Sequence, residues 1–229
     1  MCGAHSGFKG RIPRLIFLSF LCVLIILAVS RLKAEGKPSL AIFPFVVERT
    51  DDPARGAVCP VCKGSYGGGE IVPGAQIILT RELYGKMEAL GTFRIIPPEK
   101  VEEARSHSDQ MRLETNPVRS SVPLGRELNA DFVMVCHLFR FEQRVGSSIG
   151  VEKPASVAFD LHLFRIRDGA RVWDGAFNET QKALFDNLLR AGSFFKEGAK
   201  WVTAEELAAV GMDKVLKNLP GAKELEQKP

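Results

Sequence analysis

The 229-residue chain has only five cysteines, and only Cys59 and Cys62 lie close together in the sequence. That number is too small for a disulfide-dense secreted scaffold. A second cysteine pair at this spacing is missing, so the cysteines alone do not complete the four-ligand set of a structural zinc site. Paired carboxylates in an apolar setting, which indicate acid–base catalysis, are also missing. These absences argue against a disulfide scaffold and against acid–base catalysis.

The chain carries almost no excess charge outside its first thirty residues. The formal net charge is +4, but residues 1–30 hold three basic residues and no acidic one, which leaves 28 basic and 27 acidic residues after them. A nucleic-acid-binding domain concentrates basic residues on one face, so we expect no nucleic acid among the partners. Thr80 stands where a phosphate loop before Gly85-Lys86 needs glycine, so we expect no nucleotide or other cofactor.

Residues 15–29 form an uncharged apolar run, LIFLSFLCVLIILAV, which follows a basic segment. This pattern is typical of an export signal. Fifteen helical residues span roughly 22 Å, short of the roughly 30 Å hydrocarbon core of a membrane. The pattern therefore favours a cleaved signal peptide within residues 1–34 and leaves an uncleaved signal anchor in the inner membrane as the alternative. Either form places residues 35–229 outside the cytoplasm, in the periplasm.

Hydrophobic spacing beyond the leader predicts one α/β domain over residues 35–229. We expect strands at 39–47, 92–96, 131–141, 156–166 and 171–177, and helices at 74–90, 99–105, 122–128, 181–191 and 203–218. Residues 48–73 are rich in glycine and proline and are expected to form a long excursion outside the packed structure. This order predicts a mixed sheet of about five strands with helices packed on it, plus a C-terminal helical extension from about residue 181.

The sharpest local motif is Cys59-Pro60-Val61-Cys62. Two cysteines at this spacing form a redox-active disulfide or supply half of a metal site. A redox-active pair starts a helix that lowers the thiolate pKa, whereas Lys63-Gly64 and more glycines follow here. The sequence therefore favours a small structural disulfide or a loop-bound metal knuckle. Redox chemistry and unpaired or partner-binding thiols stay open as alternatives.

A second group of polar residues lies on the predicted strands. Asp160 and His162 share one face of strand 156–166, and His137 lies on strand 131–141. These three side chains bind a metal only if the two strands are neighbours in a suitable register. Adjacent polar residues on a half-exposed sheet face are commoner, and we favour that interpretation.

Aromatic residues are frequent after position 184. The cluster consists of Phe185, Phe194, Phe195 and Trp201. Large aromatic side chains are typical anchors of protein interfaces, which makes these residues candidates for partner binding. Ordinary burial of the C-terminal helices against the sheet explains them equally simply, and we favour it.

Four motifs in one order resemble a known group of envelope proteins. They are the strand 41–45 with the helix 74–90, the strand 93–96, the segment LNADFVMV at 128–135, and the Arg-Asp-Gly turn at 167–169 followed by Arg171-Val172-Trp173. This order is similar to the bacterial family that includes the curli-secretion lipoprotein, the lipoprotein activators of penicillin-binding proteins and the amino-terminal domain of the Tol-system propeller protein. The resemblance implies a periplasmic, non-catalytic α/β domain that binds other envelope proteins or itself.

We therefore expect an exported, non-catalytic cell-envelope protein that acts through protein–protein contacts in envelope assembly or secretion. One alternative is an extracytoplasmic thiol–disulfide enzyme that uses Cys59 and Cys62. Another is an oligomeric subunit of a secretion pore. The N-terminal segment contacts the membrane in each case only if it is not cleaved.

Overall fold

A computed structural model describes residues 36–49, 56–106, 117–147, 150–181 and 201–228, with only the backbone at 117–119. The predicted leader, most of the predicted helix 181–191, and Phe185, Phe194 and Phe195 lie outside the described residues. Within the described ranges, no helix has the length and apolar character needed to cross a membrane.

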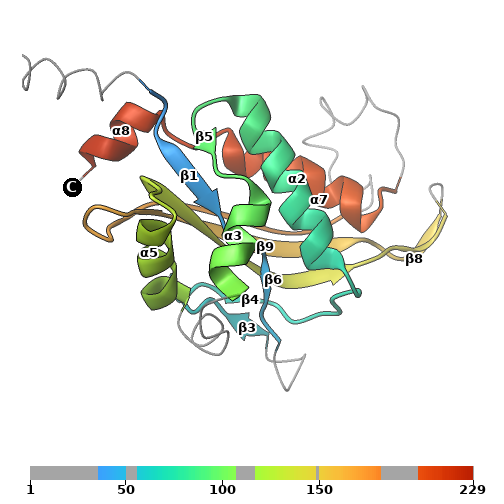
Figure 1. The fold of residues 1–229 in the computed structure, drawn as a ribbon. Helices are drawn as coiled ribbons and strands as arrows, with labels where there is room; N and C mark the ends of the chain where they lie inside the picture. Colours follow the sequence, from blue (N-terminus) through green and yellow to red (C-terminus); the bar gives the residue numbers. More distant parts are fainter. Residues whose placement is uncertain (1–35, 50–55, 107–116, 148–149, 182–200, 229) are drawn as a thin grey trace, which may run out of the picture. The chain divides into compact units, whose positions relative to one another are not determined.

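A mixed sheet forms the centre of the described chain (Figure 1). Its strands run in the order β10 (Arg171–Thr180), β9 (Ser156–Arg165), β6 (Phe132–Glu142), β1 (Ser39–Ile42) and β5 (Arg94–Ile95), and the short β2 (Val46–Val47) also pairs with β6. Strand β1 is parallel to β5 and β6, whereas β6, β9 and β10 are antiparallel. The predicted mixed sheet of about five strands with helices packed on it is confirmed.

The predicted first strand, 39–47, is divided into β1 and β2. Proline lacks the N–H group that a sheet ladder needs, and Pro44 lies in the break between the two pieces. Phe45 beside it directs its N–H to Thr80 Oγ1 at 3.0 Å instead of to a strand. Both pieces nevertheless lie parallel to β6.

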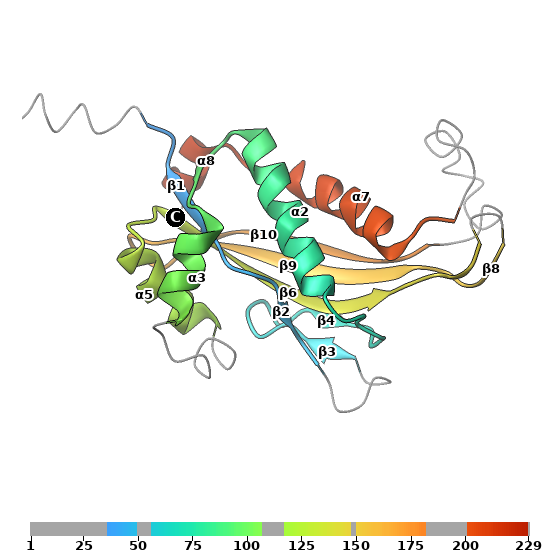
Figure 2. The ribbon, with the colours of Figure 1, turned by 45° about the vertical axis from the view of Figure 1, so that its right-hand side comes forward.

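Two helices cover one face of the sheet (Figure 2): α2 (Ala75–Leu90) and α7 (Ala204–Leu216). Helix α2 ends at Gly91, which adopts a left-handed conformation with φ of 63° that glycine tolerates without steric cost. Helix α7 starts with a capping box between Thr203 and Glu206. Helix α2 lies within one residue of the predicted range 74–90, and α7 lies within two residues of the predicted range 203–218.

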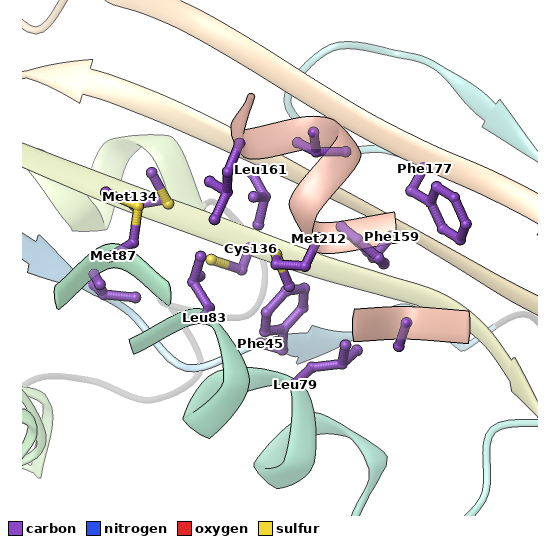
Figure 3. Close-up of a cluster of buried hydrophobic side chains, with 14 of the residues drawn as sticks. Phe45, Leu79, Leu83, Met87, Met134, Cys136, Phe159, Leu161, Phe177 and Met212 are labelled. Carbon is purple, nitrogen blue, oxygen red and sulfur yellow. The ribbon is translucent and has the colours of Figure 1, made fainter. Parts of the chain in front are cut away.

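The larger hydrophobic core lies between these helices and the sheet. Figure 3 shows side chains of α2, β6, β9 and α7 meeting there. Its labelled members are Phe45, Leu79, Leu83, Met87, Met134, Cys136, Phe159, Leu161, Phe177 and Met212. The spacing of Leu79, Leu83 and Met87, four residues apart, places all three on the buried side of α2.

The opposite face of the sheet carries α3 (Pro98–Ser106), α5 (Pro117–Glu127) and a small hairpin of β3 (Ala57–Val58) and β4 (Ser65–Tyr66). Figures 1 and 2 show this hairpin on the side of the sheet away from α2 and α7. A second hairpin pairs β7 (Val145–Gly146) with β8 (Val151–Lys153), and α8 (Ala222–Gln227) follows α7. Helix α5 starts earlier than the predicted residue 122 and accommodates Pro123 within it.

The prediction that residues 48–73 lie outside the packed structure was wrong for residues 56–73. Cys59 is 0% exposed and Tyr66 only 6% exposed. The Tyr66 ring stacks on Phe139 of β6 with centroids 3.9 Å apart. Glycine and proline form the turns of the hairpin, and its few apolar side chains are buried against one face of the sheet.

Candidate metal centre

The turn between β3 and β4 folds its backbone amides around two sulfur atoms. The N–H groups of Val61 and Cys62 donate to Cys59 Sγ at 3.2 and 3.3 Å, and Gly64 N–H donates to Cys62 Sγ at 3.3 Å. Two backbone bonds close the turn: Cys59 N–H to the Gly64 carbonyl at 2.8 Å and Lys63 N–H to the Cys59 carbonyl at 3.1 Å. Donors directed at both sulfurs favour the thiolate form. Both cysteines are free in the structure.

Strand β9 supplies two further side chains to the same place. Asp160 and His162 are two residues apart and therefore point to the same side of the sheet. They are 0% and 1% exposed, so the prediction of a half-exposed face was wrong. The β3–β4 hairpin covers this side of β9, since Ala158 of β9 belongs to the same buried cluster as Cys59 and Tyr66.

Four side chains that are distant in sequence converge beneath this hairpin. One ligand atom from each of Cys59, Cys62, Asp160 and His162 lies within 4.8 Å of the other three. His162 Nε2 is 3.2 Å from Cys59 Sγ and 3.1 Å from Asp160 Oδ1. Cys62 Sγ is 3.7 Å from Asp160 Oδ2. We call these four residues the Cys–Asp–His cluster.

Neighbouring side chains hold the two polar members of the cluster. His162 Nδ1 donates to Asp174 Oδ1 on β10 at 2.6 Å, which turns Nε2 toward the cluster. Tyr66 O–H donates to Asp160 Oδ2 at 3.1 Å. Asp160 Oδ1 is buried, and His162 Nε2, 3.1 Å away, does not meet it with the geometry of a hydrogen bond. The cluster therefore contains one carboxylate oxygen and one ring nitrogen that are available to a ligand.

Burial raises the pKa of the Cys59 thiol well above its ordinary value; the backbone N–H groups of Cys62 and Val61 oppose this effect, and the nearby Asp160 adds to it. Burial lowers the pKa of His162, but its contacts with the carboxylates of Asp160 and Asp174 outweigh this effect and raise the pKa above its ordinary value. Burial also raises the pKa of Tyr66, with a further contribution from Asp160. Without a cation the Cys59 thiol is thus protonated at neutral pH and is a poor nucleophile.

His137 lies next to the cluster but outside it. The structure confirms that β6 and β9 are neighbours and pairs His137 with Asp160 across them. His137 Nδ1, however, is 2.8 Å from Glu48 Oε1, and the centroid of its ring lies 5.9 Å from that of His162. Of the three candidate metal ligands on the strands, Asp160 and His162 lie in the cluster with the two cysteines, and His137 does not.

Of the four aromatic candidates, only Trp201 lies among the described residues. It is partly buried, and its carbonyl accepts a 2.6 Å hydrogen bond from Arg144.

A surface groove of about 600 Å³ lies along α2 and α3, and its lining includes Pro44, Thr80 and Tyr84. No residue of the Cys–Asp–His cluster lines this groove.

No family model matches the chain, and no curated protein matches its sequence. Solved structures with a similar fold exist. The PelC dodecamer from Paraburkholderia phytofirmans has a TM-score of 0.44 at 14% identity, covering 81% of this chain and 89% of that chain. Lipoprotein GNA1162 from Neisseria meningitidis has a TM-score of 0.44 at 12% identity, covering 80% and 99%. The LpoB C-terminal domain from Escherichia coli has a TM-score of 0.39 at 14% identity, covering 68% and 93%.

Proposed function

We propose that this chain is an exported, non-catalytic envelope protein that acts through contacts with other proteins. The observation that carries this proposal is the burial of its reactive groups. Cys59, Asp160 and His162 are each at most 1% exposed, because the β3–β4 hairpin that carries Cys59 packs against the face of β9 that carries Asp160 and His162. A catalytic residue has to reach its substrate, whereas these side chains face each other inside the domain.

The edge of the sheet at β10 is the surface that we assign to partner binding. Strand β10 has ten residues, and its only partner among the described strands is β9. An edge strand binds an extended segment of another protein through its free backbone groups. Lys228 Nζ donates a 2.6 Å hydrogen bond to the Val172 carbonyl. We therefore expect the part of β10 from Asp174 to Thr180 to pair with the extended segment of the partner. The basic, apolar leader supports a partner in the cell envelope.

A photo-crosslinking side chain at position 176 tests this proposal in intact cells. Ala176 is an exposed residue of β10, whereas Gly85 is exposed on α2, with nothing within 4 Å of the position that a Cβ atom would occupy. We expect a cross-linker at Ala176 to capture an envelope protein or a second copy of the chain, and a cross-linker at Gly85 to capture neither. Equal capture at both positions, or none at either, contradicts the assignment of β10.

A thiol enzyme is the second candidate, because Cys59 Sγ, His162 Nε2 and the Asp174 carboxylate lie in the order of a nucleophile, a base and an orienting acid. The burial of Cys59 and the raised pKa of its thiol oppose this function. Reaction with iodoacetamide at neutral pH distinguishes the two candidates. A thiol enzyme predicts rapid, selective alkylation of Cys59, and a non-catalytic domain predicts that Cys59 reacts no faster than the buried Cys136.

A further inference from the structure

We propose that the Cys–Asp–His cluster is a structural Zn²⁺ site with four protein ligands: Cys59 Sγ, Cys62 Sγ, Asp160 Oδ1 and His162 Nε2. This inference does not depend on the proposed function, because it rests on the geometry of the cluster alone. His162 Nε2 lies 3.1 Å from Asp160 Oδ1 and 3.2 Å from Cys59 Sγ, a few tenths of an ångström short of the edges of roughly 3.3 to 3.8 Å that tetrahedral Zn–N, Zn–O and Zn–S bonds produce. One ligand atom from each of the four residues lies within 4.8 Å of the other three, so a small adjustment of the side chains admits the ion.

The backbone of the turn supports thiolate ligands over a disulfide. Three N–H groups donate to the sulfurs of Cys59 and Cys62. A metal-bound thiolate is a strong acceptor for such donors, whereas a disulfide sulfur is a weak one. Lys63 adopts a left-handed conformation with φ of 63°, and this conformation directs the Gly64 N–H back toward Cys62. The backbone of the turn therefore provides the N–H donors that two zinc-bound sulfurs accept hydrogen bonds from.

The side chains from β9 show an independent requirement for a cation. Asp160 Oδ1 is completely buried, and its contact with His162 Nε2 at 3.1 Å lacks the geometry of a hydrogen bond; a buried carboxylate oxygen that makes no well-formed hydrogen bond is costly. A cation at the cluster pairs this oxygen. The Asp174–His162 hydrogen bond and the Tyr66–Asp160 hydrogen bond are the outer contacts that orient metal ligands in proteins.

The chemistry of the four donors selects the metal. Two thiolates with an imidazole and a carboxylate form a borderline-soft set, which suits Zn²⁺. Ca²⁺ and Mg²⁺ take six or more oxygen ligands and do not fit these donors. Because all four positions come from buried or half-buried protein side chains, the site leaves no open position for substrate and is structural. Binding releases the thiol protons to solvent.

A zinc ion at this site connects the β3–β4 hairpin to strand β9. Strands β3 and β4 have two residues each, and a hairpin this short is not stable by itself. Zinc bonds from Cys59 and Cys62 to Asp160 and His162 cross-link the hairpin to β9, over sequence separations of 98 and 103 residues. We therefore expect metal removal to release the hairpin and to leave the core between the sheet, α2 and α7 folded.

The test begins with the full-length chain, purified in detergent without chelators. We expect one zinc per chain by mass spectrometric metal analysis. After exchange with Co²⁺, we expect the visible spectrum of a tetrahedral site and the near-ultraviolet band of thiolate-to-cobalt charge transfer. X-ray absorption of the zinc form is expected to show two sulfur ligands at about 2.3 Å and two nitrogen or oxygen ligands at about 2.0 Å. A metal-free chain that weighs two hydrogen atoms less, with a Cys59–Cys62 disulfide, overturns the proposal.

Matched variants test which residues are the ligands. We expect His162→Gln and Asp160→Asn to weaken zinc binding by more than the roughly 10- to 100-fold loss that an outer contact causes. The controls are His137→Gln, a buried histidine on the neighbouring strand, and Cys136→Ala, a buried thiol in the core. Both controls are expected to keep one zinc. Zinc loss in His137→Gln as large as in His162→Gln overturns this ligand set, and the absorption measurements on the unaltered chain decide the case if a variant does not fold.

Discussion

Asp174 on β10 accepts a 2.6 Å hydrogen bond from His162 Nδ1 on β9, directly across the strand pair. His137 and Glu48 form the corresponding pair on the next strand, with Nδ1 2.8 Å from Glu48 Oε1. Each carboxylate fixes one ring nitrogen of its histidine and turns the other inward. Only the Nε2 of His162 reaches the two cysteines, and this difference provides a controlled comparison.

Asp174→Asn is expected to weaken zinc binding by about 10- to 100-fold, because a neutral amide orients His162 less firmly and makes it a weaker ligand. Glu48→Gln removes the same type of contact from His137 and is expected to leave zinc affinity unchanged. Competition with a colorimetric zinc chelator measures both variants. An equal loss in the two variants contradicts the role of Asp174 and indicates a general loss of stability.

Lys63 is exposed and adopts a left-handed conformation, with φ of 63°. This conformation is costly for most residues and free of steric strain for glycine. We expect Lys63→Gly to stabilise the protein by up to about 1 kcal/mol and Lys63→Val to destabilise it by about 1 kcal/mol or more. Urea unfolding of the zinc-loaded chain checks both. If the two variants shift stability in the same direction, the backbone of the turn is not the cause.

Gly211 allows α7 to approach β10 closely. A Cβ at this position lies 2.6 Å from two ring atoms of Phe177. We expect Gly211→Ala to destabilise the protein by about 1 to 3 kcal/mol, because the steric overlap exceeds the gain of about 1 kcal/mol in helix propensity. Gly85→Ala on α2 is the control, since nothing lies within 4 Å of its Cβ, and it is expected to stabilise by about 0.5 to 1 kcal/mol. Stabilisation by both substitutions in thermal unfolding refutes the close contact.

Asp168 accepts hydrogen bonds from Arg165 Nε and Nη2 and from the Ala170 N–H, and these contacts hold the pKa of its carboxyl well below its ordinary value. A depressed folded-state pKa contributes stability above the unfolded pKa of about 4, and this contribution is lost as the pH falls toward the folded pKa. We expect Asp168→Asn to lower the melting temperature at pH 7, and the difference from the unaltered chain to shrink steadily below about pH 4.

Acid also protonates zinc ligands, but it does so in both chains, so the difference between their melting temperatures isolates Asp168. Asp213→Asn serves as the exposed control, because the Asp213 side chain is 67% exposed and surface ion pairs contribute little. If the difference in melting temperature between Asp168→Asn and the unaltered chain stays constant with pH, the stabilising role of the Asp168 carboxylate is contradicted.

The elements with clear periodicity were predictable from sequence. Helix α2 and its end at Gly91, the capping box of α7 and strand β9 all agree with their patterns, because each depends on residues a few positions apart. Strand 39–47 was predicted as one piece, although Pro44 marks the break. The hairpin was predicted to be unpacked, because glycine and proline describe its turns and not the surface that buries it.

Local spacing in the sequence predicts the type of chemistry available to this protein. Two cysteines at C-x-x-C spacing predict a turn with two sulfurs, and Asp160 and His162 at alternating positions predict two polar groups on one face of a strand. The meeting of the two pairs depends on the fold, because strand order and the packing of the β3–β4 hairpin bring together residues 98 and 103 positions apart. The fold also excludes His137 from the cluster, because Glu48 lies beside His137 and the cysteines lie beside His162.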